Sequence, residues 1–220
     1  MNILDLEKVI IILKKYDLLD NIDNFNKWFF RLNEKRMNNL LSIYNMNLNT
    51  VLKHKGILVN LDFLNSPYYI EDIKIMEESK NDDILGCLID VALEKDSYIN
   101  EYHTEDMNMI LNAKDSYTAY YLSLVACNYL SIYNDYHKED MKKISNANNY
   151  DAKYLSIIAT DYKSLISGKH KEDMDNLNIG KLPSKEEVSN DKKISNIYEK
   201  ALKYVDGNTD KKIPKYILRS

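Results

Sequence analysis

The chain has 220 residues, of which 45% are hydrophobic and 29% are charged, a balance typical of a globular protein and not of a disordered one. Its formal net charge is −4, but residues 178–220 carry ten Lys and Arg against six Asp and Glu, so the body before them carries −8. An acidic body disfavours nucleic acid as the main partner. No stretch approaches the roughly 20 apolar residues of a membrane span, and the N-terminus has no secretory signal pattern, so we expect a cytoplasmic protein without membrane contact.

Glycine and proline are scarce, with five and three residues, and helix-forming residues are abundant, which predicts an all-α chain. Residues 4–18 form the first predicted helix, and a degenerate first repeat follows it. Residues 1–66 are therefore predicted to be an N-terminal helical cap. We expect its core to contain three consecutive aromatic residues, Trp28, Phe29 and Phe30.

A repeat occupies the middle of the chain. HKEDM stands at 137–141 and again at 170–174, and HTEDM stands at 103–107. An acidic pair keeps this register at spacings of 34, 34 and 33 residues: Glu71-Asp72, Glu105-Asp106, Glu139-Asp140 and Glu172-Asp173. Apolar residues at helical spacing follow each pair, and a second helical pattern follows a polar break. This second helix is expected to continue through Tyr129 and Tyr162.

Each unit is therefore predicted to be a helical hairpin that cannot bury its apolar face alone, so successive units must stack. The predicted fold is all-α, a helical repeat array or solenoid of helix-turn-helix units of about 34 residues with helical caps. Residues 67–178 hold three repeats and the start of a fourth, and residues 179–220 are a C-terminal capping helix and basic tail. The unit length resembles that of tetratricopeptide repeats, but the Trp, Leu-Gly and Tyr positions and the closing proline of that family are not found.

The recurring His, Glu and Asp could suggest a metal site or an acid/base pair. However, histidines at equivalent places of stacked units lie on the order of 10 Å apart and cannot share a metal ion. Adjacent carboxylates at the start of a helix point about 100° apart and favour the positive end of the helix dipole. A histidine at the entry of a helix can bridge to the previous hairpin. We therefore expect an architectural role, with no metal, no cofactor and no catalytic residue.

Other sequence motifs agree with a protein that is not an enzyme. The chain contains no GxGxxG, GxxxxGK, HExxH, GxSxG or CxxC pattern. Its two cysteines, Cys87 and Cys127, lie in apolar stretches and are expected to be buried thiols.

Helical arrays are used mostly for recognition, and tyrosine is favoured at protein interfaces. We expect a module that binds another protein, as an adaptor, scaffold or inhibitor, for example a mobile-element product that blocks a host factor. The predicted binding residues are carboxylates and tyrosines: Glu105, Asp106, Glu139, Asp140, Glu172, Asp173, Tyr120, Tyr133 and Tyr136. The alternative is single-stranded nucleic-acid binding through the basic tail and exposed tyrosines, which predicts salt-dependent binding that is lost when residues 206–220 are removed.

Overall fold

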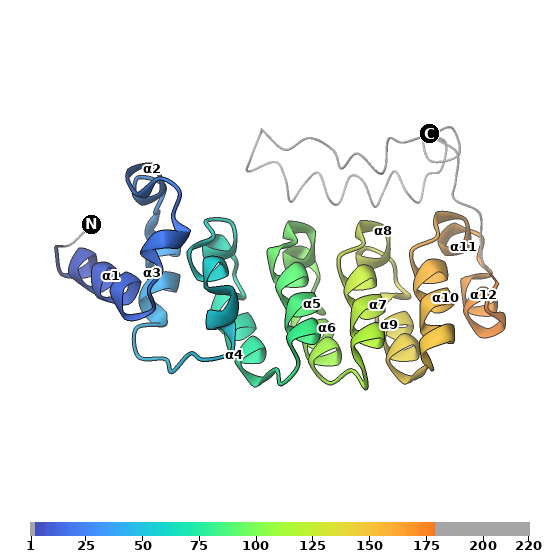
Figure 1. The fold of residues 1–220 in the computed structure, drawn as a ribbon. Helices are drawn as coiled ribbons and strands as arrows, with labels where there is room; N and C mark the ends of the chain where they lie inside the picture. The colour runs from blue at the N-terminus through green and yellow to red at the C-terminus, as the bar shows by residue number, and fades with distance from the viewer. Residues whose placement is uncertain (1–2, 179–220) are drawn as a thin grey trace.

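The structure is a computed structural model that describes residues 3–178. Within these residues every regular element is a helix and no strand occurs, so the all-α prediction is confirmed. Figure 1 shows that the helices follow one another along one direction, with the N-terminal helices at one end and α12 at the other. The predicted capping helix and basic tail of residues 179–220 lie outside the described residues.

The N-terminal part combines α-helices with 3-10 helices: α1 (Ile3–Lys15), η1 (Leu19–Asn21), α2 (Phe25–Phe29), α3 (Glu34–Ser42), η2 (Val51–Val59) and η3 (Phe63–Asn65). Trp28 is buried, and its indole N–H donates to the carbonyl oxygen of Val59 at 2.7 Å. Phe29 is half-buried, whereas Phe30 is 86% exposed just after α2. The predicted aromatic core is therefore wrong for Phe30, because the helix ends at Phe29 and leaves the next side chain in solvent.

Three hairpins follow, and each is made of a first and a second helix: α4 (Tyr69–Glu78) with α5 (Asp82–Leu93), α6 (His103–Leu111) with α7 (Ser116–Ala126), and α9 (His137–Asn146) with α10 (Asn149–Ala159). A further first helix, α12 (His170–Asn176), closes the described part. First helices contact the first helices of neighbouring hairpins, and α7 packs against both α5 and α10. The second helices therefore form one layer and the first helices lie behind them in Figure 1.

The second helix of every hairpin begins at an Asn or Asp that caps it. The side chains of Asn81, Asp115 and Asn148 accept hydrogen bonds from backbone N–H groups of the first helical turn. Such a cap satisfies N–H groups that have no partner inside the helix, and it contributes about 1 kcal/mol. The polar break in each unit thus fixes where the second helix starts.

A short third helix follows each second helix: η4 (Lys95–Ile99), α8 (Tyr129–Ile132) and α11 (Tyr162–Ile166). The second helices therefore do not continue through Tyr129 and Tyr162, which corrects the sequence prediction. The cause is a capping residue with extended backbone before each short helix, namely Glu94, Asn128 and Asp161. The carboxylate or amide oxygen of each accepts an N–H from the new helix, and this favours a new start over continuation.

One hydrophobic core runs from α1 to α12 through the interior of the hairpins. Leu88, Leu122 and Leu155 hold the same position in successive second helices, and none of them is more than 2% exposed. None of the helices in the described part of the chain has the length and hydrophobicity needed to cross a membrane.

Candidate functional site

The histidine that opens each of three first helices contacts the preceding hairpin. Its Nε2 lies within hydrogen-bond distance of an aspartate in the first turn of the previous first helix: His103 and Asp72 at 3.0 Å, His137 and Asp106 at 2.8 Å, and His170 and Asp140 at 2.8 Å. The same contact therefore joins successive hairpins three times. The expected bridge from the entry histidine to the previous hairpin is present.

Helix periodicity explains why these polar residues are inside. In α6 the buried side chains are His103, Asp106, Met107 and Ile110, which follow the i, i+3, i+4, i+7 spacing of one helix face. The apolar residues of the sequence pattern and the polar pair thus share a face. His103 and Asp106 occupy positions of the apolar stripe, so the helical spacing in the sequence was enough to predict that both are buried.

A tyrosine covers each buried histidine, and this was not predicted. The phenol ring comes from the unit that supplies the aspartate: Tyr68 lies 4.4 Å from His103, Tyr102 lies 6.4 Å from His137, and Tyr136 lies 4.8 Å from His170 between ring centroids. The signal in the sequence is a tyrosine at positions 68, 102 and 136, each directly before a first helix. Tyr68 and Tyr102 stack on their histidines, whereas Tyr136 is tilted by 38°, and each ring covers the pair from one side.

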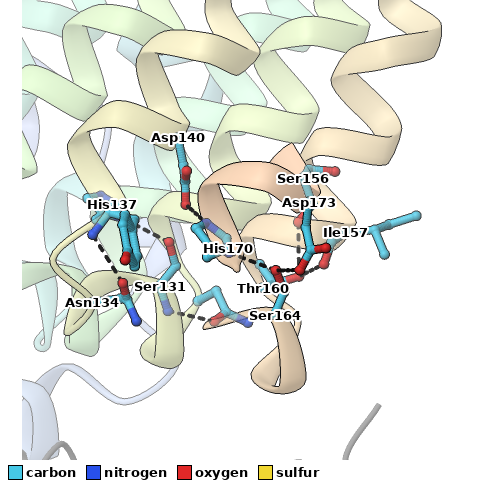
Figure 2. A network of polar contacts seen from close by, with 12 residues as sticks. Ser131, Asn134, His137, Asp140, Ser156, Ile157, Thr160, Ser164, His170 and Asp173 are labelled. Carbon is cyan, nitrogen blue, oxygen red and sulfur yellow. Dashed lines mark hydrogen bonds and ion pairs between the residues drawn. The ribbon is translucent and has the colours of Figure 1, made fainter. Parts of the chain in front are cut away.

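Two of the histidines also contact a serine of the preceding unit, which is the unit that supplies the aspartate, as Figure 2 shows. The Nδ1 of His137 lies 2.9 Å from Oγ of Ser131, and the Nδ1 of His170 lies 2.9 Å from Oγ of Ser164. In the first unit the hydroxyl of Ser97 instead donates to backbone carbonyl groups. Nδ1 of His103 consequently has no hydrogen-bond partner among the described residues.

The order Ser–His–Asp is also that of a nucleophilic triad, in which histidine activates the serine hydroxyl. Here Ser131 is 0% exposed, and both His137 and Asp106 are 1% exposed, so no substrate can reach the hydroxyl. Among residues 3–178 there is also no group of three or more His, Cys, Asp or Glu side chains that could hold a metal ion. The geometry is that of a hydrogen-bond chain that fixes packing.

Burial changes the titration of two of the aspartates. It raises the pKa of the Asp72 carboxyl, and the hydrogen bond and charge of His103 oppose this rise. Burial likewise raises the pKa of Asp140, against the same two effects of His170. Each carboxylate therefore depends on its histidine for the stabilisation that water would give at the surface.

The predicted carboxylates divide into two groups. Asp106 and Asp140 are buried against histidines, so they are corrected from surface binding residues to internal contacts. Asp173 is half-buried and accepts a hydrogen bond from Ser164 at 2.8 Å. The glutamates of the three pairs are exposed: Glu105, Glu139 and Glu172.

The predicted tyrosines also differ in position. Tyr120 is 51% exposed on α7. Tyr133 is half-buried and packs edge-on against Tyr129 at 5.1 Å, while Tyr136 is half-buried against His170. Each connector tyrosine is therefore only partly exposed, because its ring packs against a neighbouring ring.

The most exposed apolar side chains of the repeats lie on the second helices. Tyr117 on α7 is 65% exposed, and Tyr150, 33 residues later on α10, is 67% exposed. Leu124 and Ile157 form a second pair at this spacing, with 44% and 38% exposure. These four residues and Tyr120 are called the α7/α10 apolar surface below.

The equivalent positions on α5, 34 residues before Tyr117 and Leu124, hold the exposed carboxylates Asp83 and Asp90. The outward face of the second helices therefore changes from acidic on α5 to apolar on α7 and α10.

No protein-family model, curated protein sequence or solved structure matches this chain.

Proposed function

We propose that this chain is a non-catalytic protein–protein interaction module, built as a solenoid of helical hairpins, that acts as an adaptor, scaffold or inhibitor. The observation that carries the proposal is the α7/α10 apolar surface. Side chains of this size are usually buried, and a group of them on an open face is typical of a protein-binding site.

The solenoid part of the proposal is supported by the repeated His–Asp contact. Three successive hairpins and α12 are joined in series by the same kind of contact, at 3.0, 2.8 and 2.8 Å. Stacked units of this kind present equivalent residues in rows, and such rows give extended binding surfaces.

The composition of the surface favours protein over other ligands. Tyr117, Tyr120 and Tyr150 offer broad contact area at a small cost in side-chain entropy, and aliphatic side chains lie beside them. The exposed aspartates of α5 and the exposed glutamates of the first helices add negative charge, which favours a partner with a basic surface.

The test is affinity capture with the full-length chain and two variants. The first variant, Tyr117→Ser with Tyr150→Ser, changes only exposed side chains of the proposed face. The matched control, Phe30→Ser, removes an 86% exposed aromatic residue at the other end of the molecule. We expect one stoichiometric protein partner that is captured by the wild type and by Phe30→Ser but is lost from the double variant. A partner retained equally by all three proteins would contradict the proposed face.

The second candidate is single-stranded nucleic-acid binding, for which exposed Tyr117, Tyr120 and Tyr150 could provide base stacking together with the basic C-terminal tail. This candidate requires binding of an oligonucleotide that weakens steeply with salt and disappears when residues 206–220 are deleted. The absence of any binding at low salt would exclude it.

A further inference from the structure

The short helices η4, α8 and α11 form an edge of the molecule with its own composition. Figure 1 shows α8 and α11 at the same end of α7 and α10, and η4 contacts α8. Tyr129, Leu130 and Tyr133 form a small hydrophobic cluster on α8 that is separate from the main core. We call η4, α8, α11 and the three residues on either side of each the short-helix edge.

The short-helix edge is acidic. It carries five carboxylates and three lysines: Glu94, Asp96, Glu101, Asp135, Asp161, Lys95, Lys163 and Lys169. Lys95 already forms an ion pair with Asp62 at 2.7 Å. The edge therefore retains a clear excess of negative charge beside its hydrophobic cluster.

One of these carboxylates is buried and incompletely satisfied. Asp161 is 2% exposed, and its Oδ1 accepts the N–H of Lys163 at 2.9 Å, but its Oδ2 has no hydrogen-bond partner among the described residues. Burial raises the pKa of this carboxyl, and the charge of Asp173 adds to the rise. A buried carboxylate of this kind is stabilised by a nearby cation or donor.

The chain itself supplies a segment of complementary composition. Residues 194–205 have apolar side chains at the i, i+3, i+4, i+7, i+8, i+11 positions of a helix, namely Ile194, Ile197, Tyr198, Ala201, Leu202 and Val205. In such a helix Lys193 and Lys200, which are seven residues apart, would lie together along one flank of this stripe. Residues 178–220 as a whole carry a net charge of +4.

The lengths also agree. The described part ends at Asn178, directly after α12, which contacts α11. Residues 179–192 can extend over about 45 Å, which reaches any of the three short helices. A helix over residues 192–205 would be about 20 Å long. Neighbouring packed helices lie about 10 Å apart, so such a helix could span the two steps from α11 over α8 to η4.

We propose that residues 192–205 bind the short-helix edge of the same chain, with the apolar stripe on the Tyr129–Leu130–Tyr133 cluster and Lys193 and Lys200 beside its carboxylates. This contact uses none of the residues of the α7/α10 apolar surface and does not depend on the proposed function. It gives the basic segment an acidic partner within the molecule, so its positive charge is not available to nucleic acid while it is bound.

Zero-length carbodiimide cross-linking of the full-length chain tests this contact, because the reagent joins a lysine only to a carboxylate that it touches. Peptide mass mapping is expected to find Lys193 or Lys200 joined to Asp96, Glu101 or Asp135 within one chain. The yield is expected to fall when NaCl is raised from about 0.05 M to about 0.5 M, because salt screens the attraction.

A pair of variants separates this contact from random collisions. Ile197→Asp with Leu202→Asp keeps every lysine but interrupts the stripe, and it is expected to abolish these cross-links. Ile213→Asp with Leu218→Asp makes the same changes beyond the stripe and is expected to keep them. Equal yields in the two double variants would overturn the proposal. Cross-links found only in covalent dimers, or only to Asp83 and Asp90 on α5, would overturn it as well.

Discussion

At the scale of single residues, helix geometry separates the two carboxylates of each acidic pair. Glu105 and Asp106 are neighbours, so their side chains leave α6 about 100° apart. Glu105 is exposed and forms an ion pair with Lys138 at 2.7 Å, whereas Asp106 is buried against His137. One dipeptide thus provides both a surface ion pair and a buried contact between hairpins.

The buried pair is expected to contribute far more to stability than the exposed glutamates. His137→Ala should lower the free energy of unfolding by about 3 kcal/mol, because it leaves Asp106 buried without its histidine. Glu139→Ala, an exposed change on the same helix, should change it by less than about 0.5 kcal/mol. Urea unfolding followed by circular dichroism measures both values. A chelator should leave the wild-type melting temperature unchanged, and equal losses in the two variants would show that the pair is not a stabilising contact.

The histidine contact was predicted from the sequence only in part. The repeat spacing predicted that the entry histidine meets the previous hairpin, but it did not assign Asp106 or Asp140 as the partner. Both aspartates were expected on the surface. The sequence gives the angles between the side chains of one helix, but it does not show which side of that helix packs against the next hairpin. The stacking of Tyr102 on His137 depends on residues 35 positions apart, and only the packing of two hairpins brings them together.

At the scale of elements, the caps of the second helices decide where each hairpin turns. Asp115 lies at the position that Asn81 and Asn148 hold in neighbouring units. Burial alone would raise the pKa of Asp115, but hydrogen bonds from the backbone and hydroxyl groups of Thr118, together with Lys114 and Asn149, lower it overall. The ionised carboxylate is therefore favoured in the folded protein.

This lowered pKa predicts a specific pH dependence of stability. A depressed carboxyl pKa contributes stability above the unfolded value of 3.8, and this contribution is lost as the pH falls through the lower folded value. Asp115→Asn keeps a side-chain oxygen that can cap the helix but removes the carboxyl group that titrates. The free energy of unfolding of this variant should therefore change less than that of the wild type between about pH 5 and about pH 3. Asp115→Ala should lose about 1 kcal/mol even at neutral pH. Urea unfolding at several pH values measures these effects, and parallel pH profiles for wild type and Asp115→Asn would contradict the cap assignment.

Helix starts were predicted well where the repeated histidine marks them, as in α6 and α9, and helix ends were predicted less well where a cap interrupts the apolar face. Asn128 and Asp161 each precede a tyrosine that continues the apolar face, so the sequence pattern does not show the break. The deciding fact is the extended backbone of these two residues, whose side chains bond to the N–H groups that follow. Phe30 was misplaced for a related reason, since the end of a five-residue helix leaves no pattern.

At the scale of the whole molecule, the extensive contacts between the described hairpins join neighbours in the chain, as between α5, α7 and α10, so stability should depend on position. α6 and α7 have hairpins on both sides, whereas α12 has a described neighbour only on the side of α9 to α11. Local opening is therefore expected to be most costly in the middle of the molecule.

Hydrogen exchange followed by mass spectrometry tests this expectation. Amides of α6 and α7 should exchange most slowly in the wild type. Leu122→Ala should cost about 2 to 5 kcal/mol and speed exchange in α5, α7 and α10 more than in α1, because Leu122 is fully buried between neighbours. Leu124→Ala, an exposed change on the same helix, is the control and should leave the pattern unchanged. Uniform acceleration along the whole chain by Leu122→Ala would indicate that the hairpins unfold as one unit.

Each histidine contact joins the start of one unit to the aspartate of the unit before it, so every unit in the middle of the series offers the same two kinds of contact residue. Residues 103–136 begin with a histidine that contacts Asp72 of the unit before, and they carry Asp106, which contacts the histidine of the unit after. Tyr102, directly before them, covers that same histidine, and Tyr136 at their end holds the equivalent position before the next unit. The series has a defined beginning, because Tyr69 occupies the histidine position of its unit and donates to the carbonyl oxygen of Leu58 in the N-terminal part. A duplicated copy of residues 103–136 would therefore meet complementary partners on both sides, and the molecule could lengthen by whole units without a new kind of joint.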